Sequence, residues 1–151
     1  DSQCERTGIS VRSRRSETMS PSPGLAKQLP VLLIEDEVAV MGYVRAVLER
    51  SGYTVVWSES GADGLRQLES GEFMGVVSDM RTPGGVNGAD VHAWIVRNRP
   101  ELVSRLVFIT GDIANEETAA TLERTGVPCV EKPFRVQQFI SVVEQTMGKP
   151  E

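Results

Sequence analysis

The stretch VVSDMRTPGG, residues 76–85, combines the end of a buried strand with a carboxylate and a sharp turn. Its apolar run ends at Asp79, and the chain then turns through Thr-Pro-Gly-Gly. Continuous apolar runs are typical of strands that are covered on both faces, as in a parallel sheet. Because open parallel sheets bind ligands beyond the carboxyl ends of their strands, Asp79 is a candidate functional residue.

Similar apolar runs recur along the chain and alternate with amphipathic helical patterns. Five strands are predicted, at Val31–Ile34, Thr54–Trp57, Val76–Val77, Leu106–Ile109 and Val127–Val130. The first helical pattern has an apolar face of Val40, Val44, Val47 and Leu48, and the last has one of Val136, Phe139, Ile140, Val143 and Met147. This succession predicts an α/β fold, a doubly wound five-stranded parallel sheet with helices on both faces.

Length and charge suggest one domain with a tail and make a nucleic-acid-binding surface improbable. Residues 1–29 are rich in Ser, Arg and Pro without a hydrophobic period, which predicts a flexible tail or interdomain linker. Residues 30–148 should form the domain, and residues 149–151 a short C-terminal tail. Residues 30–151 carry eleven basic and eighteen acidic side chains, whereas phosphate backbones require clustered Lys and Arg. We therefore expect no direct contact with nucleic acid.

Cysteine usage and hydropathy indicate the compartment. Cys4 and Cys129 are the two cysteines, and they form neither a disulfide framework nor a CxxC metal pair. No apolar run approaches the roughly 18 residues needed to span a bilayer. We expect a cytoplasmic segment without membrane contact.

Charged and hydroxyl side chains follow the predicted strands. Glu35 and Asp36 follow the first strand, Asp79 the third, Thr110 the fourth and Lys132 the fifth. Each acid alone is compatible with a helix cap or a solvated turn, but together they would repel by about 4 kcal/mol for a pair 4 Å apart at an effective dielectric of 20. A Mg²⁺ ion would relieve that repulsion. With Lys132 and Thr110 as partners for phosphate oxygens, the pattern predicts a phosphoryl-binding site.

Four segments carry a family resemblance: VLLIEDE (31–37), VVSDMRTPGG (76–85), FITGD (108–112) and VEKPF (130–134). They resemble the signature segments of the response-regulator receiver domain of two-component signalling, in the same order and over about residues 30–148. The resemblance implies a flavodoxin-like fold with strand order 2-1-3-4-5 and five helices. It also implies that an Asp accepts a phosphoryl group from a phosphohistidine, so the expected partner is a histidine kinase or a histidine phosphotransfer domain.

The resemblance assigns roles by position. Asp79 matches the phospho-acceptor, Thr110 the switch hydroxyl and Lys132 the family lysine, which is expected to precede a cis bond to Pro133. The implied Mg²⁺ ligands are Glu35, Asp36, Asp79 and the backbone carbonyl of Arg81. Such a domain is not itself an enzyme, although it promotes its own phosphorylation and dephosphorylation.

This chain departs from the family pattern at three places. The segment from Asp79 to Gly88 is one residue longer than in common members, which leaves the loop's shape open. Arg81 and Asp112 occupy the two variable positions beside the acceptor, and their opposite charges are expected to pair across the cleft. Cys129 stands where many relatives carry Tyr or Phe, so we expect weak coupling between phosphorylation and the face around the last strand.

Several alternatives remain open from the sequence. A phosphatase of the haloacid dehalogenase type also uses an Asp after a strand, but it normally needs a second Asp where this chain has Arg81. The lone His92 is expected to be an ordinary helix residue rather than a phosphodonor. Residues 106–134 resemble receivers fused to the C-termini of hybrid histidine kinases, so that origin is favoured over a free-standing regulator. A weak homodimer is compatible with either.

Overall fold

A central parallel sheet organises the molecule. The computed structural model describes residues 28–150, so most of the predicted tail lies outside the described residues. The strands are β2 (Val31–Ile34), β3 (Val55–Ser58), β4 (Gly75–Asp79), β5 (Leu106–Thr110) and β6 (Cys129–Glu131). All neighbouring strands run parallel, in the order β3-β2-β4-β5-β6. Numbered along the chain, this is 2-1-3-4-5, and the predicted topology is confirmed.

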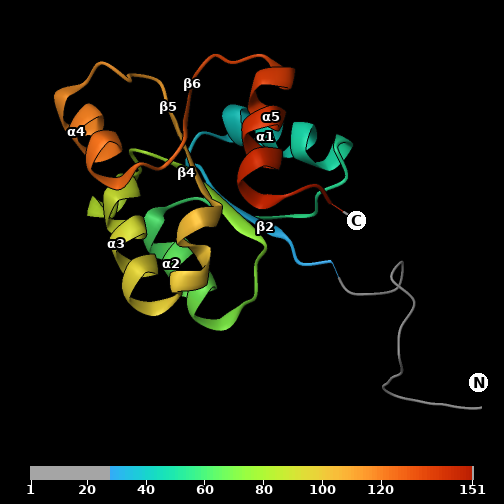
Figure 1. The fold of residues 1–151 in the computed structure, drawn as a ribbon, viewed down its shortest axis with the longest axis horizontal. Coiled ribbons are helices and arrows are strands. Elements are labelled where there is room, and N and C mark those ends of the chain that lie inside the picture. The colour runs from blue at the N-terminus through green and yellow to red at the C-terminus, as the bar shows by residue number, and fades with distance from the viewer. Residues whose placement is uncertain (1–27, 151) are drawn as a thin grey trace, which may run out of the picture.

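Helices cover both faces of the sheet, as expected (Figure 1). On one face, α1 (Val38–Arg50) and α5 (Val136–Met147) bury apolar side chains against the sheet. On the other lie α2 (Gly61–Ser70), α3 (Gly88–Asn98) and α4 (Glu116–Thr125). The two cores share the strands because successive strand residues point to opposite faces. Leu33 thus packs with the first core and Leu32 with the second.

Helix ends follow the local sequence signals. Asn87 and Asp90 form a reciprocal capping box at the start of α3, which satisfies two otherwise free backbone N–H groups. At the end of α4, Gly126 adopts a left-handed conformation with φ 70°, as expected for a terminating glycine.

Within the described residues, no helix combines the length and apolar character that crossing a membrane requires.

Several element boundaries differ from those expected. The last strand begins at Cys129 rather than Val127, although Val127 is still buried. Two short 3-10 helices, η3 (Pro83–Gly85) and η4 (Pro100–Arg105), were not predicted. Each begins at a proline, whose fixed φ suits the first turn of a helix. Because apolar periodicity does not register such short turns, they could not be read from the pattern.

Candidate functional site

The register of the sheet aligns the ends of the strands. Ile34 of β2 pairs with Ser78 of β4, so the next residues, Glu35 and Asp79, are neighbours at the same edge. Thr110 ends β5, and its carbonyl accepts a 2.7 Å hydrogen bond from the backbone N–H of Lys132, just after β6. Parallel pairing therefore gathers residues that are far apart in the sequence into one place.

Three carboxylates meet at this edge. Ligand oxygens of Glu35, Asp36 and Asp79 lie within 4.8 Å of one another. Glu35 is fully buried, Asp79 is 6% exposed and Asp36 is exposed. The Glu35 side chain accepts a 3.0 Å bond from the Glu37 backbone N–H through Oε2, but its buried Oε1 makes no hydrogen bond. This edge therefore holds more negative charge than its hydrogen-bond donors satisfy.

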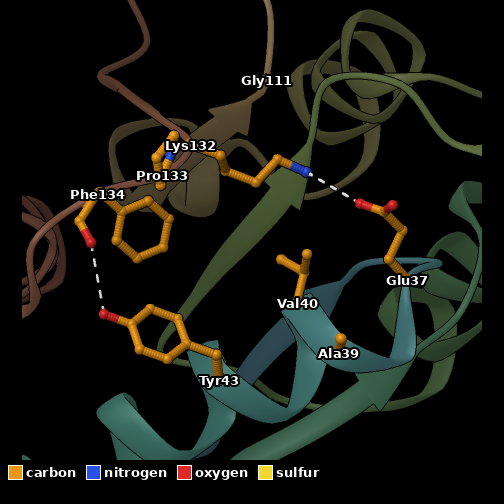
Figure 2. A pocket seen from close by; sticks show the side chains of 8 residues that line it. All are labelled: Glu37, Ala39, Val40, Tyr43, Gly111, Lys132, Pro133 and Phe134. Carbon is orange, nitrogen blue, oxygen red and sulfur yellow. Dashed lines mark hydrogen bonds and ion pairs between the residues drawn. The ribbon is translucent and has the colours of Figure 1, made fainter.

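Lys132 is the cation that faces the cluster. Its Nζ lies 3.2 Å from Asp79 Oδ2, 3.5 Å from Glu35 Oε1 and 3.7 Å from Glu37 Oε1. Figure 2 shows the lysine chain extended toward Glu37. Its ammonium group offsets only part of the acidic charge, because it serves all three carboxylates at once.

Burial and charge shift the pKa values of these groups. Burial is the main reason that the pKa of Glu35 rises to about 7, opposed by the Glu37 backbone hydrogen bond and aided by the charge of Asp79. Burial also raises the pKa of Asp79, opposed by Lys132. For Lys132, burial alone would lower the pKa, but the negative charges of Asp79 and Glu35 outweigh it and raise the pKa. These directions mean that ionising the two buried carboxylates costs free energy in this site.

The donor set fits a hard divalent cation. Carboxylate oxygens are the ligands that Mg²⁺ prefers, and it commonly uses one or two of them with water and phosphate. Glu35 supplies a buried oxygen without a hydrogen-bond partner, while exposed Asp36 leaves the other side open to solvent. The backbone N–H of Arg81 donates to Asp79 Oδ1 at 3.4 Å, so the Arg81 backbone also lies at this site.

An open cleft of about 310 Å³ lies above the cluster. Thr110 lines it with only 3% of its surface exposed, and its Oγ1 accepts a 3.2 Å bond from the Asp112 backbone N–H. All the sequence-predicted site residues except Glu35 line this cleft, and Glu35 lies beneath them. Its lining residues are Asp36, Glu37, Asp79, Arg81, Thr110, Gly111, Asp112 and Lys132.

The expected pairing of Arg81 with Asp112 is wrong in this structure. The Arg81 guanidinium instead lies 4.0 Å from Glu117 Oε1, in the first turn of α4. The longer Glu side chain extends from the helix start toward the loop, whereas the short Asp112 side chain leaves from the turn after β5. Arg81 and Glu117 are both largely exposed, so the contact contributes at most about 1 kcal/mol.

A second hollow, about 590 Å³, adjoins the cleft and was not anticipated from the sequence. It lies between the start of α1 and the segment after β6, and Figure 2 shows Tyr43 and Phe134 facing one another there. The Tyr43 hydroxyl donates to the Phe134 carbonyl at 3.4 Å, and their rings are 5.8 Å apart. The expected cis Lys132–Pro133 bond is present beside it. Its apolar lining is Ala39, Val40, Tyr43, Pro133 and Phe134.

Two other residues singled out in the sequence lie away from the cluster. His92 is half-buried in α3, where burial and the nearby charge of Arg124 lower its pKa. Cys129 is half-buried in β6, and burial raises the pKa of its thiol to about 11. Neither belongs to the acidic site.

Comparison with known proteins gives one consistent family. The response regulator receiver domain matches residues 31–144. The chain is 31% identical over 145 residues to the sensor kinase CckA of Brucella abortus, covering 93% of this chain and 14% of that protein. It is 27% identical to the transcriptional regulatory protein QseB of Escherichia coli O157:H7, covering 79% of this chain and 53% of that protein.

A solved structure agrees with these sequence relationships. The receiver domain of NtrX from Brucella abortus superimposes with a TM-score of 0.69 at 27% identity, covering 78% of this chain and 97% of that one. The chain spans about half or less of the length of CckA and QseB, so the activities of those whole proteins are not transferred to it. With the fold, the acidic edge and a family match over most of the described residues in agreement, this chain belongs to the response regulator receiver domain family of two-component signalling.

Proposed function

We propose that Asp79 accepts a phosphoryl group from the phosphohistidine of a histidine kinase or a histidine phosphotransfer domain. The observation that carries this proposal is the position of Asp79, whose carboxylate contacts Lys132 at 3.2 Å and lines the open cleft. It thus combines a charge partner with access for a substrate. Glu35, the other buried acid of the cluster, does not line that cleft.

The transfer requires an in-line displacement at phosphorus. An oxygen of Asp79 forms the new bond to phosphorus while the bond from phosphorus to the imidazole nitrogen breaks and the imidazole leaves with the electron pair. Lys132 offsets charge on a phosphoryl oxygen, and the Thr110 hydroxyl donates a hydrogen bond to another. These residues orient the group and lower its charge, so the domain promotes its own phosphorylation without being a dedicated enzyme.

We further propose that Glu35, Asp36, Asp79 and the Arg81 backbone carbonyl would hold Mg²⁺ at this site. When bound, the ion supplies positive charge that offsets the repulsion among the carboxylates and the charge of the phosphoryl oxygens. The buried Glu35 Oε1 supports this assignment, because it accepts no hydrogen bond and its ion-pair partner Lys132, 3.5 Å away, is shared with two other acids.

The donor protein would approach along the apolar hollow beside Lys132. Receiver domains interact with histidine kinases or phosphotransfer proteins, and this hollow directly adjoins the cleft that contains Asp79.

We propose the cytoplasm as the location of this domain. The identity with CckA favours a hybrid kinase as the parent protein, which the full reading frame of the gene would test. Its acidic body disfavours direct binding to nucleic acid.

Phosphorylation in vitro tests the acceptor assignment. Incubation with acetyl phosphate and Mg²⁺ should add one phosphoryl group to the protein, measured by intact mass, and the Asp79→Asn variant should remain unlabelled. Asp112→Asn is the matched control, because Asp112 is an exposed acid that lines the same cleft. Undiminished labelling of Asp79→Asn would contradict the proposal.

A further inference from the structure

We propose that Thr82 is a positioning residue that directs the Arg81 backbone carbonyl toward Mg²⁺. The inference rests on the proposed function, because it takes that carbonyl to be a metal ligand. Thr82 is three residues beyond Asp79 and is partly buried in the loop between β4 and α3. Its hydroxyl connects this loop to a different part of the chain, the start of α2.

The Thr82 hydroxyl makes two hydrogen bonds in opposite senses. Its Oγ1 accepts from the Gly61 backbone N–H at 3.3 Å and donates to the Val86 carbonyl. A hydroxyl has one proton and two lone pairs, so both bonds form together. Gly61 is the first residue of α2, where the N–H has no partner within the helix. Thr82 therefore closes the loop on itself and attaches it to α2.

Close packing makes this attachment specific. A Cβ atom on Gly61 would lie 2.5 Å from the Val86 carbonyl oxygen and 2.7 Å from its Cγ1, so only glycine permits this approach. Between Thr82 and Val86, Gly84 and Gly85 have φ values of 87° and 83°. These left-handed conformations return the chain to Thr82, at a conformational cost that other residues would increase.

The attachment reaches the site through one rigid peptide group. The carbonyl of Arg81 and the nitrogen of Thr82 belong to the same planar unit, so fixing Thr82 restricts the direction of the carbonyl. On its other side, the Arg81 N–H is bonded to Asp79 Oδ1 at 3.4 Å. The base of the loop is closed by the Gly88 N–H, which donates to the Met80 carbonyl at 2.8 Å. Without the Thr82 hydroxyl, the middle of the loop would lose its link to α2.

Calorimetric titration with Mg²⁺ alone tests the proposal. Thr82→Val replaces the hydroxyl with a methyl group and should weaken Mg²⁺ binding about tenfold, as is typical when a residue supporting a metal ligand is removed. Thr82→Ser keeps the hydroxyl and should restore binding. Thr125→Val is the matched control, since the Thr125 hydroxyl bonds to the Thr121 carbonyl at 2.8 Å within α4. That variant should bind Mg²⁺ as the wild type does.

A second readout separates positioning from a general structural role. With acetyl phosphate as donor, Thr82→Val should need more Mg²⁺ but should approach the wild-type rate when Mg²⁺ is saturating. A lower melting temperature with unchanged Mg²⁺ affinity would overturn the inference and leave the proposed function intact. A wild-type protein that does not bind Mg²⁺ would instead contradict the proposed metal site itself, and this inference with it. If Thr82→Val does not fold, Thr82→Ala serves in the same titration.

Discussion

The two ends of the sheet differ in how far their polar groups are satisfied by hydrogen bonds. At the amino end, Arg105 Nη1 donates to the carbonyls of Met74 and Met147 at 3.0 and 2.9 Å. Nearby, the buried Tyr53 hydroxyl donates to the Gly148 carbonyl at 2.7 Å. These bonds join the last helix to the strand starts, so this end is satisfied without any ligand.

At the carboxyl end, the polar groups are not fully satisfied by partners within the protein. Glu35, Glu37 and Asp79 share Lys132 as a cation, and Asp36 adds a further carboxylate to the cluster. One buried oxygen of Glu35 has no hydrogen-bond partner. Like charges in a partly buried site reduce stability unless a cation is added. The amino end therefore stabilises the fold, whereas the repulsion at the carboxyl end lowers the stability of the protein until a cation binds there.

Of the changes considered, addition of Mg²⁺ should alter the free energy of unfolding most, because it acts on the acidic carboxyl end. At a concentration 100-fold above its dissociation constant, Mg²⁺ should stabilise the wild type by about 2.7 kcal/mol, because it binds the folded site. Thermal unfolding monitored by circular dichroism would measure this. Asp36→Asn removes an exposed ligand and should abolish most of the gain, whereas Asp112→Asn should retain it. Equal stabilisation of both variants would place Mg²⁺ elsewhere.

Arg105→Ala should destabilise the amino end of the sheet. Loss of the two hydrogen bonds to the Met74 and Met147 carbonyls should lower the free energy of unfolding by about 2 kcal/mol, in urea denaturation without metal. Mg²⁺ affinity should not change, because Arg105 directly precedes β5, at the opposite edge of the sheet from the acidic cluster. Arg97→Ala, an exposed arginine on α3, is the control for loss of charge. Weaker Mg²⁺ binding in Arg105→Ala would contradict the separation of the two ends.

Asp79→Asn should make the metal-free protein more stable, by about 1 to 2 kcal/mol. It removes one charge from the repulsive cluster, while Lys132 keeps Glu35 and Glu37 as partners. The same urea titration measures this at neutral pH, and excess Mg²⁺ should reverse the order because the wild type then gains more. A less stable metal-free variant would show that the ion pair with Lys132 outweighs the repulsion.

Tyr53→Phe should have the smallest effect, a loss of about 1 kcal/mol from the missing bond to Gly148. Burial, with the negative charge of Glu144, raises the pKa of Tyr53 from 10.0 to about 12. A raised pKa means that the folded state binds the phenolic proton more tightly, so its stabilising contribution is present below pH 10 and lost between pH 10 and 12. Between pH 10 and 12, the free energy of unfolding should therefore fall more steeply with pH for the wild type than for Tyr53→Phe. Urea denaturation at several pH values would measure this.

Much of the fold could be predicted from local patterns. The strand Val31–Ile34 was predicted with its observed bounds, because four adjacent apolar residues lie between Pro30 and Glu35. The start of β6 was misplaced by two residues, since Val127 is apolar and buried yet lies before the strand. Val136 was expected on the apolar face of α5 but is 48% exposed, because it occupies the first position of the helix.

The candidate site was predictable in part for a related reason. Acids at the ends of parallel strands must lie on one edge, so the meeting of Glu35, Asp36 and Asp79 follows from the strand assignments. The partner of Arg81 was not predictable, because Glu117 reaches it from another element. Likewise, the hydroxyl of Thr82 meets Gly61 only after α2 and the loop have packed together.

The alternation of strands and helices, the edge at which the acids gather and the family of the chain all follow from the order of its residues. Apolar periodicity and residues at strand ends are local properties, so they can be read along the chain. By contrast, the folded arrangement is what places Lys132 against Asp79, Glu35 and Glu37 together and leaves one oxygen of Glu35 without a hydrogen bond. These contacts join side chains from different loops, and their burial depends on how the strands and helices pack. They therefore exist only when the whole domain has folded.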